Sequence, residues 1–419
     1  MRIPTRCVRL ADPRDPYGAV APPLYQTATF RQESAAEFGE YDYTRTANPT
    51  RSLLEAKLAE LEGARHALAY TSGMAAVTAL LGLLEPGDQV LAGDDLYGGT
   101  ARLLGRIAPE RGLTVRFGAA TDPGAIAAAL ARSTRLLLVE TPTNPLLEIA
   151  DLGRLAEIAR RHGTLLAVDN SLATPLLQRP LEHGAHLVVH SATKGLGGHA
   201  DLVAGAVVTD DATIHDRLAF RRNAEGTALA PFEAWLLLRG LKTLAPRLAW
   251  QCRSARRIAE FLAAHPAVER VYFPALPDHP GRAIHERQAS GPGPLVSFTT
   301  GDPELSRRIV ESLELFTIAV SFGAVGSVAS LPCRMSHASV PEELAGRLRP
   351  PPDLVRLSVG VEDPDDLLAD LERALARAGA ANTLASQREE QRWEPAALNS
   401  AGASRLARPE PADRPDRVG

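Results

Sequence analysis

Residues 164–170 (TLLAVDN) and 185–194 (AHLVVHSATK) decide the fold class of this chain. Each is a short apolar run that ends in polar residues, which is typical of a strand buried on both faces of a parallel sheet. Residues 89–95 (QVLAGDD) and 134–142 (TRLLLVETP) have the same form. Helical stretches such as 151–163 lie between these runs. The order predicts a doubly wound α/β domain with ligand sites at the carboxyl ends of its strands.

The domain boundaries follow from changes in this pattern. Residues 1–50 are predicted to form an irregular N-terminal arm, and residues 51–245 the ligand-binding α/β domain. After residue 245 a long helical stretch (247–266) is followed by strand-like and helix-like segments, which predicts a smaller C-terminal α+β domain over 246–380. Residues 381–419 contain few bulky apolar residues and several prolines, so we expect a disordered tail there.

The composition excludes several classes of function. The 419 residues are 45% hydrophobic and 23% charged with a net charge of -4, which gives no electrostatic case for nucleic acid or an acidic membrane. The N-terminus has no apolar leader, and no apolar run is long enough to span a bilayer. Three widely separated cysteines argue against a disulfide framework or a zinc site. We therefore expect a cytoplasmic protein without a metal.

Lys194 and Asp169 are the first candidates for chemistry, because each follows a predicted strand. A lysine that can bond to an aldehyde and an aspartate that can pair with a pyridinium nitrogen are the minimum needed to use pyridoxal phosphate (PLP). A solvated lysine and an aspartate at a turn are the alternative interpretation.

A phosphate site is predicted at residues 70–76 (YTSGMAA), where Gly73 and Met74 begin a helix whose free amides can bind an anion. An ordinary N-cap by Ser72 is the alternative. Hydroxyls beside the lysine and the extended pair Tyr43 and Arg45 can add further phosphate contacts.

Seven segments together resemble the Cys/Met-metabolism family of PLP enzymes, which includes cystathionine γ-lyase, cystathionine γ-synthase, methionine γ-lyase and O-acylhomoserine sulfhydrylases. The resemblance runs from about residue 5 to 378 and rests on YDYTRTANPT (41–50), YTSGMAA (70–76), DDLYGGT (94–100), ETPTNPLLEIADL (140–152), VDNSLATP (168–175), HSATKGLGGHAD (190–201) and LVRLSVGVED (354–363). It implies the aspartate aminotransferase-like fold of PLP enzymes, called fold type I, and a homotetramer arranged as a dimer of dimers.

The resemblance also implies roles for individual residues. Lys194 corresponds to the lysine that bonds to the cofactor and moves protons, and Asp169 to the partner of the pyridine nitrogen. Tyr97 corresponds to a residue that stacks on the cofactor ring and transfers protons. The implied phosphate contacts are Gly73, Met74, Ser191 and Thr193, together with Tyr43 and Arg45 from a neighbouring subunit. Asn144 corresponds to a residue near the phenolic oxygen of the cofactor and the substrate. Arg356 and Ser321 correspond to residues that bind the substrate carboxylate.

The function implied is γ-elimination from a sulfur amino acid, of the cystathionine γ-lyase or methionine γ-lyase type. A γ-replacement, as in cystathionine γ-synthase or an O-acylhomoserine sulfhydrylase, is the alternative, and a catalytically degenerate binding protein is a remote one. Val320 stands where cystathionine-processing relatives carry glutamate, which favours an apolar substrate end. Gly195 and Gly326 also depart from the family pattern, which leaves a specialised secondary-metabolism enzyme open.

Overall fold

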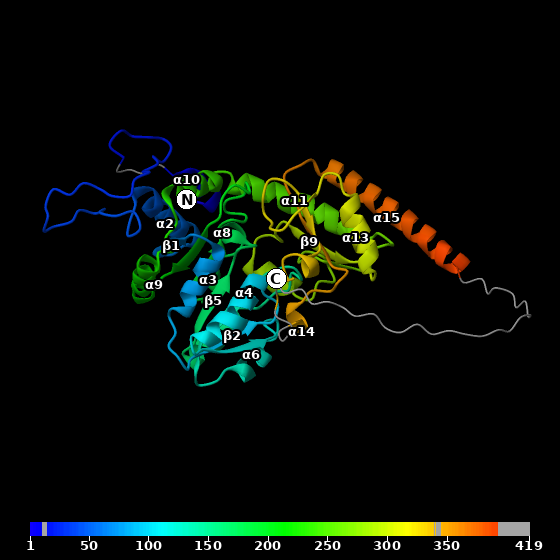
Figure 1. Ribbon diagram of the computed structural model, residues 1–419, viewed down its shortest axis with the longest axis horizontal. Coiled ribbons are helices and arrows are strands. Elements are labelled where there is room, and N and C mark those ends of the chain that lie inside the picture. Colours follow the sequence, from blue (N-terminus) through cyan, green and yellow to red (C-terminus); the bar gives the residue numbers. More distant parts are fainter. Residues whose placement is uncertain (11–14, 339, 341–344, 393–419) are drawn as a thin grey trace, which may run out of the picture. The chain divides into compact units, whose positions relative to one another are not determined.

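The computed structural model describes residues 1–10, 15–338, 340 and 345–392 (Figure 1). Its helices are α1 (Ile3–Val8), α2 (Pro49–Glu62), α3 (Gly73–Leu81), α4 (Gly98–Arg102), α5 (Ala108–Glu110), α6 (Pro123–Ala129), α7 (Leu152–His162), α8 (Thr174–Leu177), α9 (Ala212–Glu225), α10 (Pro231–Leu241), α11 (Leu244–Ala263), α12 (Arg282–Gln288), α13 (Pro303–Ser312), α14 (Ala345–Leu348) and α15 (Pro364–Arg392). Three other helical turns are the π-helix η1 (Leu103–Ile107) and the 3₁₀ turns η2 (Pro180–His183) and η3 (Pro332–Arg334).

The larger sheet has seven strands in the order β1-β7-β6-β5-β4-β2-β3. The strands are β1 (His66–Tyr70), β2 (Gln89–Gly93), β3 (Thr114–Gly118), β4 (Thr134–Glu140), β5 (Leu165–Asp169), β6 (Leu187–Ser191) and β7 (Gly205–Thr209). All neighbours are parallel except at β7, which runs antiparallel to both β1 and β6. The predicted α/β class is confirmed, and the four strands expected from apolar runs are β2, β4, β5 and β6.

Helices cover the larger sheet, so most residues of its central strands are buried. Leu138, Ala167 and Val189 belong to a core with residues of α3 and α9, whereas Leu137 and Val168 belong to one with α7. This arrangement explains why these strands are continuous apolar runs instead of alternating ones. The carboxyl ends of β4, β5 and β6 therefore meet at one edge, where their last residues are polar.

A second sheet has five strands in the order β10-β11-β12-β9-β8. Its strands are β8 (Arg270–Tyr272), β9 (Leu295–Thr299), β10 (Thr317–Ile318), β11 (Val328–Ser330) and β12 (Val355–Ser358). Residues from α11, α13 and α15 pack on this sheet around Phe273 and Phe298. The elements agree with an α+β segment after residue 245, and the domain boundary at that position stays a prediction.

The chain divides close to the C-terminal boundary expected at residue 380, but the first residues beyond that boundary are helical. The chain divides into Met1–Gly379 and Ala380–Gly419, and the described residues of the second unit, 380–392, are helical. Helix α15 thus continues past residue 381, where the sequence predicts the tail to begin, because alanine, leucine, arginine and glutamate over 381–392 are good helix formers. The rest of the predicted tail lies outside the described residues.

Candidate active site

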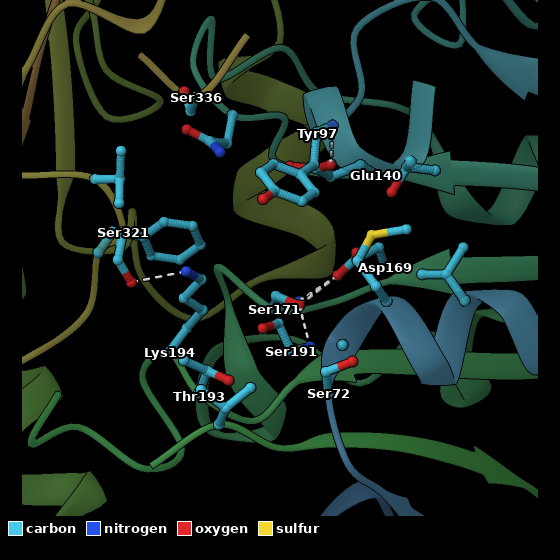
Figure 2. A pocket seen from close by; sticks show the side chains of 18 of the residues that line it. Ser72, Tyr97, Glu140, Asp169, Ser171, Ser191, Thr193, Lys194, Ser321 and Ser336 are labelled. Atoms are coloured by element: carbon cyan, nitrogen blue, oxygen red, sulfur yellow. Dashed lines mark hydrogen bonds between the residues drawn. The ribbon is translucent and has the colours of Figure 1, made fainter. Parts of the chain in front are cut away.

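A cavity of about 400 Å³ lies at the carboxyl ends of β4, β5 and β6, a volume that suits a small organic ligand (Figure 2). Glu140 and Asp169 are the last residues of β4 and β5 and are paired in register. Residues 320–322 and Arg356 of the second sheet region also line the cavity. Segments far apart in the sequence thus surround one volume.

Lys194 projects into this cavity, and its Nζ donates a hydrogen bond to Ser321 Oγ at 2.7 Å (Figure 2). Burial and then the nearby Arg356 guanidinium lower the pKa of Lys194 to about 8, against an opposing effect of Asp169. A sizeable fraction of the side chain is therefore the neutral amine near pH 8, which is the form that attacks a carbonyl or removes a proton. The interpretation of Lys194 as a solvated lysine is wrong.

Asp169 lies deep in the same cavity. Its Oδ1 accepts hydrogen bonds from the Ser171 N–H at 2.9 Å and the Ser171 hydroxyl at 2.5 Å. Burial raises the pKa of Asp169, and the two hydrogen bonds from Ser171 oppose that rise. A buried carboxylate that faces a cavity is stabilised by a cation placed beside it, and a protonated pyridine nitrogen is such a cation.

The amino end of α3 borders the cavity through Gly73 and Met74. Ser72 is the N-cap, because its Oγ accepts from the Ala75 N–H at 3.0 Å, which confirms the alternative interpretation of Ser72. The first amides of a helix have no acceptor within it, which leaves those of Gly73 and Met74 for an anion. Ser191 and Thr193 line the cavity at the same end, as expected.

Arg356 is 1% exposed and is held by two neighbours. Its Nη1 donates to Asn144 Oδ1 at 2.8 Å, and its Nη2 donates to the Ser321 carbonyl at 2.7 Å. Burial lowers the pKa of Arg356 to about 10, so the group remains cationic at neutral pH. Its Nε is buried without a hydrogen-bond partner. A guanidinium that lines the cavity suits a substrate carboxylate.

Tyr97 is the N-cap residue of α4 and lines the cavity with a side chain that is 40% exposed. Its backbone N–H donates to Glu140 Oε2 at 3.1 Å (Figure 2). Most predicted site residues therefore meet around one cavity: Lys194, Asp169, Tyr97, Gly73, Met74, Ser191, Thr193, Asn144, Arg356 and Ser321.

Tyr43 and Arg45 do not line this cavity. The Arg45 guanidinium lies over the Tyr43 ring at 5.1 Å, and its Nε donates to Asn223 Oδ1 at 3.2 Å. Both side chains are exposed in the arm. Within one chain, these two residues are therefore separate from the other predicted phosphate contacts.

The sequence analysis missed several residues of the cavity, above all Glu140, Ser171 and Phe322. Glu140 carries the same signal as Asp169, a carboxylate at the end of an apolar run, and could have been found by it. Phe322 lies 5.2 Å from Lys194 Nζ, measured to its ring centroid, and carries no local signal.

The residues present fit PLP. Lys194 can bond to its aldehyde, Asp169 can pair with its ring nitrogen, and the start of α3 can bind its phosphate. Among the described residues, no group of three or more His, Cys, Asp or Glu is placed to hold a metal ion. None of the described helices is long and apolar enough to cross a membrane.

Comparisons with known proteins show the family to which the chain is similar. The model of the family described as Cys/Met metabolism PLP-dependent enzymes matches residues 4–376. A chloroplastic cystathionine β-lyase of Arabidopsis thaliana is 48% identical over 372 residues, which is 89% of this chain and 80% of that protein. A cystathionine γ-lyase of Bacillus subtilis is 45% identical over 358 residues, 85% of this chain and 94% of the relative. A cystathionine γ-synthase structure from Xanthomonas oryzae pv. oryzae, in complex with cystathionine, is 42% identical with a TM-score of 0.88, covering 91% of this chain and 99% of that one.

Proposed function

The chain belongs to the Cys/Met metabolism family of PLP-dependent enzymes, and we propose that it breaks a carbon–sulfur bond of cystathionine or a related amino-acid thioether. The membership confirms the family and cofactor inferred from the sequence motifs. The observation that carries the proposal is the amine of Lys194, with its pKa near 8, beside Asp169 and Arg356 in one cavity. Together these groups can bind an amino acid by its carboxylate and remove its Cα proton.

The proposed reaction assigns one task to each of these residues. The Arg356 guanidinium binds the substrate carboxylate, and the Lys194 amine removes the Cα proton. When bound, PLP supplies an electron sink for the resulting charge, and Asp169 keeps the ring nitrogen protonated. The Tyr97 hydroxyl gives a proton to the departing sulfur.

Cystathionine can be cleaved on either side of its sulfur, and we place β-elimination first. It requires removal of the Cα proton only, which Lys194 alone can perform, and its product is pyruvate. The higher identity to a cystathionine β-lyase, 48% against 45% for the γ-lyase, supports this order. The γ-elimination implied by the family resemblance is the second candidate, because it also needs a proton to leave Cβ.

The experiment is a product assay of the purified holoenzyme with cystathionine. Pyruvate and homocysteine report β-elimination, whereas 2-oxobutyrate and cysteine report γ-elimination. Methionine is tested beside cystathionine. Val320 adds an uncharged side chain to the cavity wall, which favours a substrate with an apolar end. Incubating O-acylhomoserine with and without cysteine tests γ-replacement. Absence of keto acid from both cystathionine and methionine would refute the proposal.

Lys194→Ala is the matched variant for this assay. We expect loss of turnover by at least about 10³-fold, because the base and covalent anchor are removed together. After reduction with borohydride, the wild-type chain should carry PLP on the peptide that contains Lys194. Recovery of labelled cofactor on another lysine in the variant would contradict the assignment.

The proposal also covers the oligomeric assembly of the protein and its location in the cell. Tyr43 and Arg45 of a second copy would complete the phosphate end of the cavity, in a dimer of dimers with shared sites. A cytoplasmic location also remains a proposal.

A further inference from the structure

We propose that Glu140 and His337 clamp the peptide group between Leu96 and Tyr97 from opposite ends and so fix the Tyr97 ring at the cavity. The inference rests on the proposed function, in which the Tyr97 hydroxyl transfers a proton. Neither Glu140 nor His337 was among the residues expected from the sequence. Both are positioning residues, since they act through the Tyr97 backbone.

Glu140 holds the N–H end of this peptide group. The Tyr97 N–H donates to Glu140 Oε2 at 3.1 Å. Glu140 is 8% exposed, and burial followed by the nearby Asp169 and Asp95 raises its pKa well above the usual range. A carboxyl group accepts hydrogen bonds in both protonation states, so this contact does not depend on its charge.

His337 holds the C=O end of the same peptide group. Its Nε2 lies 3.3 Å from the Leu96 carbonyl oxygen, and its Nδ1 lies 3.0 Å from the Ser336 hydroxyl. Burial lowers the pKa of His337 to about 4, so the imidazole is neutral at physiological pH. Because a carbonyl can only accept, Nε2 carries the hydrogen and donates it to Leu96, while Nδ1 accepts from Ser336.

Close packing prevents the peptide group from turning away from these partners. A Cβ at Gly98 would lie 2.6 Å from the Ser336 carbonyl oxygen, so the two loops are in direct contact. A Cβ at Gly99 would lie 2.5 Å from the Tyr97 ring and 3.0 Å from Met74 Sδ. The two glycines bring the loop against Ser336 on one side and the ring on the other.

The clamp matters because Tyr97 is 40% exposed, so the position of its ring depends on its backbone. Rotation of the Leu96–Tyr97 peptide group would carry the Cα–Cβ bond with it and displace the hydroxyl. A displacement of about 1 Å can reduce a rate about 10²-fold. Two buried side chains that bind the same peptide group oppose that rotation from both ends.

The test compares variants that remove each contact with variants that keep it. Glu140→Leu and His337→Leu remove the acceptor and the donor, whereas Glu140→Gln and His337→Gln retain them. We expect kcat to fall about 10- to 100-fold in the leucine variants with KM changed less than about threefold. The glutamine variants should stay within about threefold of wild type. Equal losses in the leucine and glutamine variants would overturn the clamp.

Two readouts separate positioning from a general structural effect. In a Tyr97→Phe background, Glu140→Leu should reduce kcat by less than about threefold, because the two losses share one cause. In the apoprotein labelled with 3-fluorotyrosine, the ¹⁹F resonance of Tyr97, assigned by its loss in Tyr97→Phe, should broaden or shift in both leucine variants. An unchanged resonance, or fully additive losses, would refute the inference.

The outcomes also distinguish this inference from the proposed function. Full activity of Tyr97→Phe would contradict proton transfer by Tyr97 and leave the clamp to be decided by the ¹⁹F resonance. If Glu140→Leu fails to fold, His337→Leu tests the clamp from the other end. The side-chain hydrogen bonds of His337 go to Leu96 and Ser336.

Discussion

Lys194 illustrates how burial adapts a single residue to its chemistry. With its pKa lowered to about 8, the neutral fraction at pH 6 is about 1% and increases roughly tenfold with each pH unit until it levels off above pH 8. The rate at which apoprotein captures PLP should follow this curve, because only the neutral amine attacks the aldehyde. Stopped-flow absorbance measures this rate of PLP capture, and the reaction of PLP with Nα-acetyl-lysine is the control. A rate that rises to pH 10 before levelling off would contradict the lowered pKa.

Arg356 provides a second prediction for a single residue. Arg356→Lys keeps the charge but loses the planar group that binds Asn144 and Ser321 and that we propose to bind the substrate carboxylate. We expect KM for the amino acid to rise about 10- to 100-fold, as for loss of a charge-assisted hydrogen bond, and kcat to change less. For a substrate analogue without the carboxylate, KM should be nearly the same in wild type and in the variant. A variant with unchanged KM would place the substrate carboxylate elsewhere.

The start of helix α3 carries the prediction for an element. A Cβ at Gly73 would lie 2.7 Å from the Ser191 Cβ, so Gly73→Ala must push α3 away from the end of β6. Overpacking of this kind costs about 1–3 kcal/mol, and we expect PLP affinity to fall by about tenfold or more. Titration of apoprotein with PLP measures the loss. Gly153→Ala in α7, where a Cβ meets its nearest atom at 3.6 Å, is the control and should bind normally.

Assembly of the whole molecule decides whether the arm contributes to catalysis. Tyr43 and Arg45 are exposed and lie outside their own chain's cavity, which supports a shared site. Arg45→Ala and Lys194→Ala chains should each be weakly active or inactive alone. Random mixing should restore about one quarter of the activity, because half of the dimers are mixed and each has one complete site of two. Verified mixed dimers without activity would show that each chain supplies its own phosphate contacts.

The local sequence pattern determined many of the strands and site residues of this protein. Strands β4, β5 and β6 were predictable because burial on both faces makes each a continuous apolar run, and the polar residue that ends each run marks the site. Asp169, Lys194 and the start of α3 follow directly. β7 was not predicted. Its antiparallel direction could not be inferred from the sequence, because an apolar run has the same form in a parallel and in an antiparallel strand. β10 was not predicted because it has only two residues.

Only the tertiary structure decided how those pieces act together. The hydrogen bond from Arg356 to Asn144 joins residues 212 positions apart, and that from Lys194 to Ser321 joins residues 127 apart. The lowered pKa of Lys194 and the neutral state of His337 both come from burial, which a residue's neighbours in sequence do not define. The sequence by itself therefore determined the residue types, the strand ends and the cofactor they suit. The fold determined their distances and protonation, because both depend on which distant segments exclude water from the cavity.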